Sequence, residues 1–142
     1  MNDSNFTIKG LKTWETHDGG GYQFNLYLDG KKFAWVHDDG HGGATDVSYY
    51  AEGNHKLLQD YIDTMPQYDY CGLTMTPSID TWLGDLLDKY ERNKKLAKLR
   101  KNAILFRLTT DDEKEFRSLS TLDLTKAKAW LDKNHPNQYI LI

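Results

Sequence analysis

One segment of the chain constrains the fold more than any other, because its side chains alternate between the two faces of an extended strand. Residues 22–28 read Tyr-Gln-Phe-Asn-Leu-Tyr-Leu, the period-2 pattern of a half-buried β-strand. The next two residues, Asp29 and Gly30, suit a type I′ turn, in which both central residues take positive φ. Residues 32–37 then return as the partner strand. The sequence therefore predicts an antiparallel hairpin.

A two-residue turn also determines which residues face each other across the hairpin. The expected cross-strand pairs are Leu28 with Lys31, Leu26 with Phe33, Phe24 with Trp35, and Tyr22 with His37. The last three pairs share one face and form an aromatic ladder, which stabilises hairpins. A slip of one residue would turn that face to solvent, so we expect a well-defined register.

The rest of the chain carries alternating strand and helix patterns. Further strands are expected at 6–11, 46–50, 103–108, 115–119 and 139–142, and helices at 54–65, 78–101 and 125–134. Asn54 and Ser78 are the expected N-caps of the first two helices, and 67–76 is expected to be a loop. We predict one α+β domain over residues 1–142: an N-terminal antiparallel β-meander, two helices, and then strand–strand–helix–strand.

Composition narrows the class of protein. The chain has 142 residues, of which 39% are hydrophobic, enough for one domain with a buried core. All four tryptophans lie where core packing would account for them. The single cysteine, Cys71, excludes an internal disulfide and a cysteine-based zinc site. The sequence has no apolar run of about 18 residues and no secretion signal, so we expect a soluble, cytoplasmic protein without a membrane partner.

The net charge of −3 is unevenly distributed along the chain. Residues 1–88 contain 5 Lys/Arg and 14 Asp/Glu, whereas residues 89–142 contain 13 Lys/Arg and 7 Asp/Glu. Such asymmetry is typical of an interaction surface, and it also arises when two halves of a protein attract each other. The sequence leaves both interpretations open.

The main candidate site follows from the hairpin. Segments 17–21 and 38–43 flank its two strands and must lie at the same end, opposite the Asp29-Gly30 turn. The candidate ligand- or partner-binding residues there are His17, Asp18, Gly20, Tyr22, His37, Asp38, Asp39 and His41. Imidazoles and carboxylates can bind a divalent metal that activates water, and glycine-rich backbone can approach a phosphate. Glycine and aspartate also favour turns for purely local reasons, which is the structural alternative.

No recognised catalytic signature accompanies these residues. The sequence has no metalloprotease or other paired-histidine motif, no phosphate-binding loop and no nucleophile elbow. We therefore assign no catalytic residue, no metal ligand and no cofactor; the sequence favours a non-enzymatic function and leaves an enzyme as the alternative.

A second candidate site is the basic end of the long helix. Lys94, Lys98 and Lys101 share one helix face and could follow a phosphate backbone. The alternative is a solvated helix stabilised by acid-before-base pairs four residues apart. Those pairs would be Asp85 with Lys89, Asp88 with Arg92, and Glu91 with Lys95.

Four stretches resemble a family of small accessory proteins of tailed phages and prophages. They are residues 9–14 (KGLKTW), 17–22 (HDGGGY), 26–32 (LYLDGKK) and 38–43 (DDGHGG), and Leu105-Phe106-Arg107 after the lysine-rich helix is similar too. The resemblance covers most of the chain in layout and is concentrated in residues 9–43. It implies a phage-encoded protein acting inside a bacterial cell, and it implies no particular activity.

These observations lead to three hypotheses of function. The first is a non-enzymatic binding protein that antagonises a bacterial defence system by binding a host protein or sequestering a nucleotide signal. The second is a metal-dependent phosphoesterase or nucleotide hydrolase that uses the His/Asp cluster. The third is a nucleic-acid-binding accessory protein that uses the basic helix end.

Overall fold

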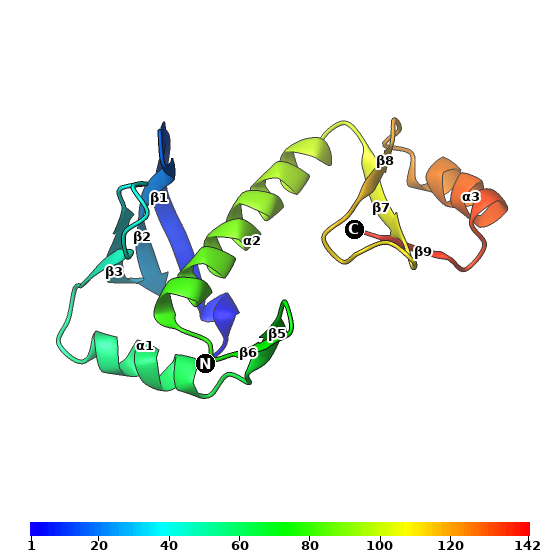
Figure 1. Ribbon diagram of the computed structural model, residues 1–142. Helices are drawn as coiled ribbons and strands as arrows, with labels where there is room; N and C mark the ends of the chain where they lie inside the picture. Colours follow the sequence, from blue (N-terminus) through cyan, green and yellow to red (C-terminus); the bar gives the residue numbers. More distant parts are fainter. The chain divides into compact units, whose positions relative to one another are not determined.

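The computed structural model describes residues 1–142 and has the predicted α+β architecture (Figure 1). The chain forms two compact units, Met1–Lys89 and Tyr90–Ile142. The long helix α2 (Ile79–Leu99) contributes residues to both. One domain over the whole chain stays a prediction. None of the helices combines the length and the apolar character needed to cross a membrane.

The first unit contains the predicted β-meander. Its sheet consists of β1 (Phe6–Thr16), β2 (Gly19–Leu28), β3 (Lys31–Asp38) and β4 (Asp46–Tyr49), antiparallel in the order β1-β2-β3-β4. Asp29 (φ 49°) and Gly30 (φ 81°) both take the positive φ that a type I′ turn requires, so the predicted turn is confirmed.

The predicted hairpin register is right at the turn and wrong beyond it. Leu28 pairs with Lys31, as expected, but a β-bulge at Phe33 then shifts the pairing by one residue. The remaining pairs are Leu26 with Ala34, Phe24 with Val36, and Tyr22 with Asp38. Phe33 and Ala34 are consecutive and both buried, at 3% and 0% exposed, and only a bulge can turn two neighbours to one face. Because of the bulge, the expected aromatic ladder does not form.

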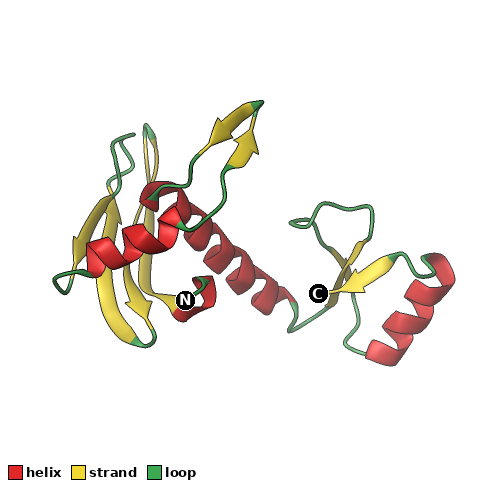
Figure 2. Cartoon of the chain, turned by 90° about the horizontal axis from the view of Figure 1, so that it is seen from below, coloured by secondary structure: helices red, strands yellow, loops and turns green.

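Two helices cover the inner face of this sheet, where the core lies (Figure 2). Phe6 contacts Tyr61 of α1 (Asn54–Asp63) and Trp82 of α2, with ring centroids 5.8 and 4.8 Å away. Leu58 and Leu83 are fully buried beside them. Burying a leucine side chain stabilises a fold by about 1.5–3 kcal/mol, so this packing holds the helices against the strands.

A carboxylate near the N-terminus joins three elements of the first unit. Asp3 lies in a short 3₁₀ helix (Asp3–Asn5), and its Oδ1 accepts hydrogen bonds from Tyr61 Oη (2.6 Å) and Trp82 Nε1 (2.9 Å). Lys89 Nζ lies 3.5 Å from Oδ2. Burial alone would raise the pKa of Asp3, but these donors together hold that pKa below its ordinary value. The carboxylate is therefore ionised wherever the protein is folded at neutral pH.

The burial of Tyr61 and its hydrogen bond to Asp3 predict that the protein becomes less stable at alkaline pH. Burial, followed by the hydrogen bond to Asp3, raises the pKa of Tyr61 from 10.0 to about 12. Between these values the unfolded chain loses the phenolic proton and the folded protein keeps it, so the free energy of unfolding falls as pH rises. Urea unfolding at a series of pH values above 9 should show this slope. In Tyr61→Phe the alkaline slope should be shallower, and an unchanged slope would contradict this assignment.

The two predicted helix caps have different outcomes. Ser78 caps α2, since its Oγ accepts a hydrogen bond from Thr81 N (3.2 Å), as expected. Asn54 does not cap α1. The cap residue is Gly53, with φ 86°, and Asn54 Nδ2 donates instead to the carbonyl oxygen of Phe33 (3.0 Å). The same carbonyl oxygen also accepts from Tyr50 N (3.1 Å), so the asparagine is its second donor.

Residues 67–76 were expected to form a loop, but they contain a small hairpin. Its strands are β5 (Tyr68–Tyr70) and β6 (Leu73–Met75), joined by Cys71 (φ 51°) and Gly72 (φ 80°). Positive φ at both positions is the pattern of a type I′ turn. Such turns are usually signalled by Asn-Gly or Asp-Gly, so Cys71-Gly72 did not predict one from the sequence. The cross-strand pairs Tyr68–Met75 and Tyr70–Leu73 share one face, and all four side chains are exposed.

The second unit contains the predicted strand–strand–helix–strand order. A three-stranded antiparallel sheet in the order β8-β7-β9 is formed by β7 (Ile104–Leu108), β8 (Arg117–Leu119) and β9 (Tyr139–Leu141). Helix α3 (Leu124–Asn134) buries Ala127 and Leu131, as expected. Trp130 was expected in the core and is instead 45% exposed, and Trp82 is the one tryptophan in the buried core.

Candidate binding face and glycine loops

The structure brings together the two glycine loops that flank the central hairpin. His17 and Asp18 form the two-residue turn between β1 and β2, and the 38–43 segment follows β3. His41 Nδ1 lies 3.1 Å from Asp18 Oδ2, with both side chains exposed. Thr16 Oγ1 donates a hydrogen bond to the carbonyl oxygen of Gly40 (2.6 Å). The expected juxtaposition of these two segments is therefore present.

Close backbone contact between the loops depends on two glycines. A Cβ added to Gly40, whose φ is 82°, would lie 2.7 Å from the backbone nitrogen of Gly21. A Cβ added to Gly21 would lie 2.1 Å from Trp14 Nε1. The same indole N–H donates to the carbonyl oxygen of Asp39 (3.2 Å). Glycine at these positions lets the loops and the Trp14 ring lie against one another.

The carboxylates of the second loop hold the loop itself. Asp38 Oδ1 accepts from Gly40 N (2.9 Å), and its Oδ2 accepts from Thr45 Oγ1 (3.2 Å). Asp39 Oδ1 accepts from His41 N (2.8 Å). The two contacts with backbone amides are Asx-turn contacts, which agree with the local structural alternative. No three of the His, Cys, Asp and Glu side chains are grouped so that they could hold a metal ion.

Two of the predicted site residues lie apart from the histidines. Tyr22 belongs to the inner face, where it stacks on Phe24 with centroids 6.0 Å apart, and burial raises the pKa of its phenol. Gly20 pairs with Glu15 inside the β1–β2 ladder and is exposed. The bulge at Phe33 explains the separation of Tyr22 from His37, because it places the two on opposite faces of the sheet.

An aromatic cluster on the outer face is the main feature that the sequence did not reveal. His37 stacks on Trp35, with centroids 5.1 Å apart and planes 12° apart, and its ring centroid lies 5.6 Å from that of Trp14. All three side chains are half-buried. His37 Nδ1 is buried without a hydrogen-bond partner. Three large rings thus lie together on the side of the sheet away from the helices.

Lysines, amides and further rings surround this cluster. Lys9 Nζ lies 4.5 Å from the ring centroid of Tyr27, and Lys32 Nζ lies 5.7 Å from that of Tyr50. Tyr50 Oη donates to Asn25 Oδ1 (2.6 Å). We call this surface the outer face; its members are Lys9, Lys12, Trp14, Gln23, Asn25, Tyr27, Lys32, Trp35, His37 and Tyr50. Among the strand positions on this side, only Asp46 is acidic.

The basic helix end is exposed, and its expected ion pairs are absent. Lys94, Lys98 and Lys101 are all exposed and form no ion pair. The predicted acid-before-base pairs do not form either. Lys89 pairs with Asp3; Arg92 donates to the backbone carbonyls of Glu113 and Lys114; and Lys95 lies over the Phe116 ring. Salt bridges along the helix therefore do not account for this cluster of cations.

Comparisons with known proteins add no relative to this description. Neither the known protein families, nor the curated proteins, nor the solved structures contain a match to this chain.

Proposed function

We propose that this protein is a non-enzymatic binding protein that holds an oligonucleotide on the outer face of its N-terminal sheet. The observation that carries the proposal is the Trp14–His37–Trp35 cluster with lysines beside it. The ligand chemistry is a nucleobase joined to a phosphate. Such a ligand comes from two sources, a stretch of single-stranded nucleic acid or a small nucleotide signal.

The aromatic rings of the outer face can stack nucleobases. Proteins that bind single strands without a strong sequence preference place aromatic side chains on an open surface, and each stacked base contributes about 1–3 kcal/mol. Trp14 and Trp35 flank His37 and remain partly accessible. A base can stack on either indole without displacing core residues, since the core lies on the other side of the sheet.

The lysines of the outer face can attract phosphates. Lys9, Lys12 and Lys32 lie on the outer face, and Asp46 is the one acidic residue among the strand positions there. Two of these lysines are held over tyrosine rings, which keeps each cation next to an aromatic surface. Phosphates would therefore meet positive charge on the same face as the rings that stack the bases, although the whole chain carries a net charge of −3.

The shape of the surface favours a chain of nucleotides over an isolated one. Small-molecule sites are concave and enclose most of their ligand. The outer face is one side of a four-stranded sheet, and the glycine loops lie at its edge beside Trp14. Within the setting implied by the phage resemblance, such a protein would sequester a nucleotide signal or cover a single strand. The carboxylates of Asp38 and Asp39 already serve as turn acceptors, so the hydrolase hypothesis gains no support.

Fluorescence anisotropy of labelled oligonucleotides tests the proposal. Single-stranded DNA and RNA of 12 nucleotides, cyclic dinucleotides and mononucleotides form the arms, and they distinguish the two sources of ligand. We expect saturable binding of the 12-mers, of the cyclic dinucleotides or of both at low salt, weakening as salt increases, and weaker binding of mononucleotides. Absence of binding in every arm at low salt would overturn the proposal and leave a host protein as the partner.

Charge-reversal variants distinguish oligonucleotide binding at the outer face from binding at the basic helix end. Lys9→Glu, Lys12→Glu and Lys32→Glu together should abolish binding of the single-stranded oligonucleotides. Replacing the three lysines by glutamine instead should reduce the slope of log K against log salt by about 2, since each phosphate contact in a single strand contributes about 0.7. The matched control carries the same substitutions at Lys94, Lys98 and Lys101. A loss confined to that control would assign binding to the helix.

A further inference from the structure

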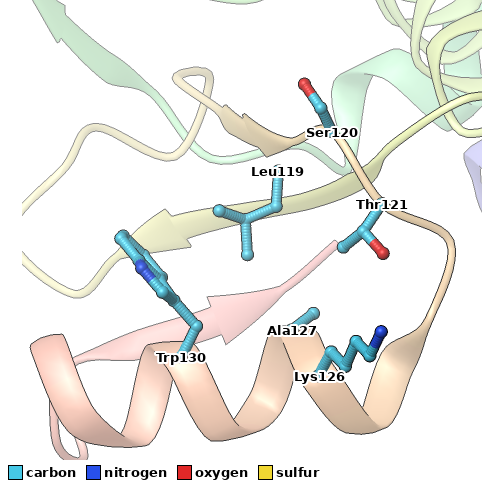
Figure 3. A pocket seen from close by; sticks show the side chains of 6 residues that line it. All are labelled: Leu119, Ser120, Thr121, Lys126, Ala127 and Trp130. Carbon is cyan, nitrogen blue, oxygen red and sulfur yellow. The ribbon is translucent and has the colours of Figure 1, made fainter.

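The second unit carries a separate hollow between its edge strand and its helix. The hollow has a volume of about 260 Å³ and is lined by the end of β8 and one side of α3 (Figure 3). Its lining residues are Leu119, Ser120, Thr121, Lys126, Ala127 and Trp130. Figure 3 shows the Leu119 side chain directed toward α3, with the Trp130 ring at one end and Lys126 toward the other.

We propose that this hollow is a peptide-binding groove that takes one apolar side chain of an acidic, extended segment of a partner protein. The proposal does not depend on the function assigned to the N-terminal sheet, because every residue that it uses lies in the second unit. Three observations carry it: the size of the hollow, the open edge of β8, and the charge around α3.

The size fits a side chain better than a complete small molecule. Sites for small molecules have volumes of about 300–1,000 Å³ and enclose most of the ligand. A hollow of about 260 Å³ lies near the lower end of this range and opens at the surface, so it would leave much of a small molecule exposed. The exposed Trp130 ring forms one wall and offers a flat apolar surface, a feature common at the centre of protein interfaces.

The sheet offers backbone groups next to the hollow. β8 is an edge strand, since the order of the sheet is β8-β7-β9. An extended peptide can pair with such an edge while one of its side chains enters a pocket beside it. Leu119 ends β8 and also lines the hollow, so one peptide can reach both.

The charge around α3 selects an acidic partner. Lys126, Lys128 and Lys133 lie on this helix and form no ion pair. Asp123 at the N-cap and Asp132 on the helix offset part of this charge and leave a balance of one positive charge around α3. Lys126 lines the hollow, and the second unit as a whole contains 12 Lys and Arg against 7 Asp and Glu. This charge matches a segment in which acidic residues flank an apolar one.

A synthetic peptide tests this groove in the full-length protein. The probe is an acetylated nonapeptide of alternating glutamate and threonine with one central leucine, and the controls replace leucine by glycine or every glutamate by lysine. We expect saturable binding of the probe, at least tenfold tighter than of either control, with a change in tryptophan fluorescence. Equal binding of all three peptides, or no binding at millimolar concentration, would overturn the proposal.

Variants of the lining residues test whether the peptide binds in this groove. Trp130→Ala and Thr121→Arg should each weaken probe binding at least tenfold, because one removes a wall and the other fills the hollow. Thr125→Arg on the same helix adds the same charge outside the hollow; it is the matched control and should not weaken binding. Trp130 is 45% exposed, so its removal leaves the core intact, which thermal unfolding can verify. Unchanged binding by both groove variants would refute the site.

Discussion

Replacing Trp14 and Trp35 together by alanine should weaken oligonucleotide binding about 100-fold or more. Each ring that stacks a base contributes about 1–3 kcal/mol, and 1.4 kcal/mol corresponds to a factor of ten in the dissociation constant. Both rings lie around His37 on the outer face, so the double variant removes the stacking surface and keeps the lysines. Anisotropy titrations at a fixed low salt concentration would measure the loss.

Conservative and distant substitutions serve as controls for this result. Trp35→Phe keeps an aromatic face and should lose less than a third of the free energy that Trp35→Ala loses. Trp130→Ala, in the second unit, should bind the oligonucleotide as the unmodified protein does. Trp14 also donates to the Asp39 carbonyl oxygen, so the melting temperature of each Trp14 variant must be checked. If a folded double variant retains full affinity, stacking on this cluster is wrong.

Alanine at Gly40 should destabilise the first unit by roughly 2–5 kcal/mol. A left-handed backbone conformation costs a non-glycine residue about 1–2 kcal/mol, and forcing a methyl group into a packed site costs about 1–3 kcal/mol more. Gly40 meets both conditions, because its φ is 82° and an added Cβ would lie 2.7 Å from Gly21 N. Urea unfolding should show the decrease in the free energy of unfolding.

Alanine substitutions at two neighbouring glycines distinguish the backbone cost from the packing cost of Gly40→Ala. Gly42 has a φ of 80° but open space around the position of a Cβ, so Gly42→Ala should cost only the backbone term, about 1–2 kcal/mol. Gly43 has neither constraint, and Gly43→Ala should change stability by less than about 0.5 kcal/mol. Equal costs for Gly40→Ala and Gly42→Ala would mean that the close contact with Gly21 is unimportant.

Local patterns in the sequence were enough to predict most of the elements. The alternation of residues 22–28 and the Asp29-Gly30 turn are local signals, and both the strand and the turn are confirmed. Ser78 is a local signal too, because its side chain bonds to an amide three residues away. In each case the interaction that decides the structure lies within a few residues of the signal.

The bulge at Phe33 could not be predicted in this way. Its cause is long-range: Phe33 packs on Phe6 of β1 and Tyr49 of β4, and Asn54 of α1 binds its carbonyl oxygen. No pattern within residues 31–38 contains those contacts. The consequence for the site was large, because an error of one residue in register moves Tyr22 and His37 to opposite faces. The convergence of the glycine loops survived the error, since it depends only on strand order.

Indole N–H resonances test the central claim most directly, because the four tryptophans report on three different places. Trp14 and Trp35 lie on the outer face, Trp82 lies in the buried core, and Trp130 borders the hollow of the second unit. In ¹⁵N–¹H spectra of the full-length protein titrated with a single-stranded 12-mer, the signals of Trp14 and Trp35 should shift and saturate together, while those of Trp82 and Trp130 stay in place. Saturating shifts of Trp130 alone, or no shift at Trp14 and Trp35 with bound oligonucleotide, would contradict an oligonucleotide site on the outer face.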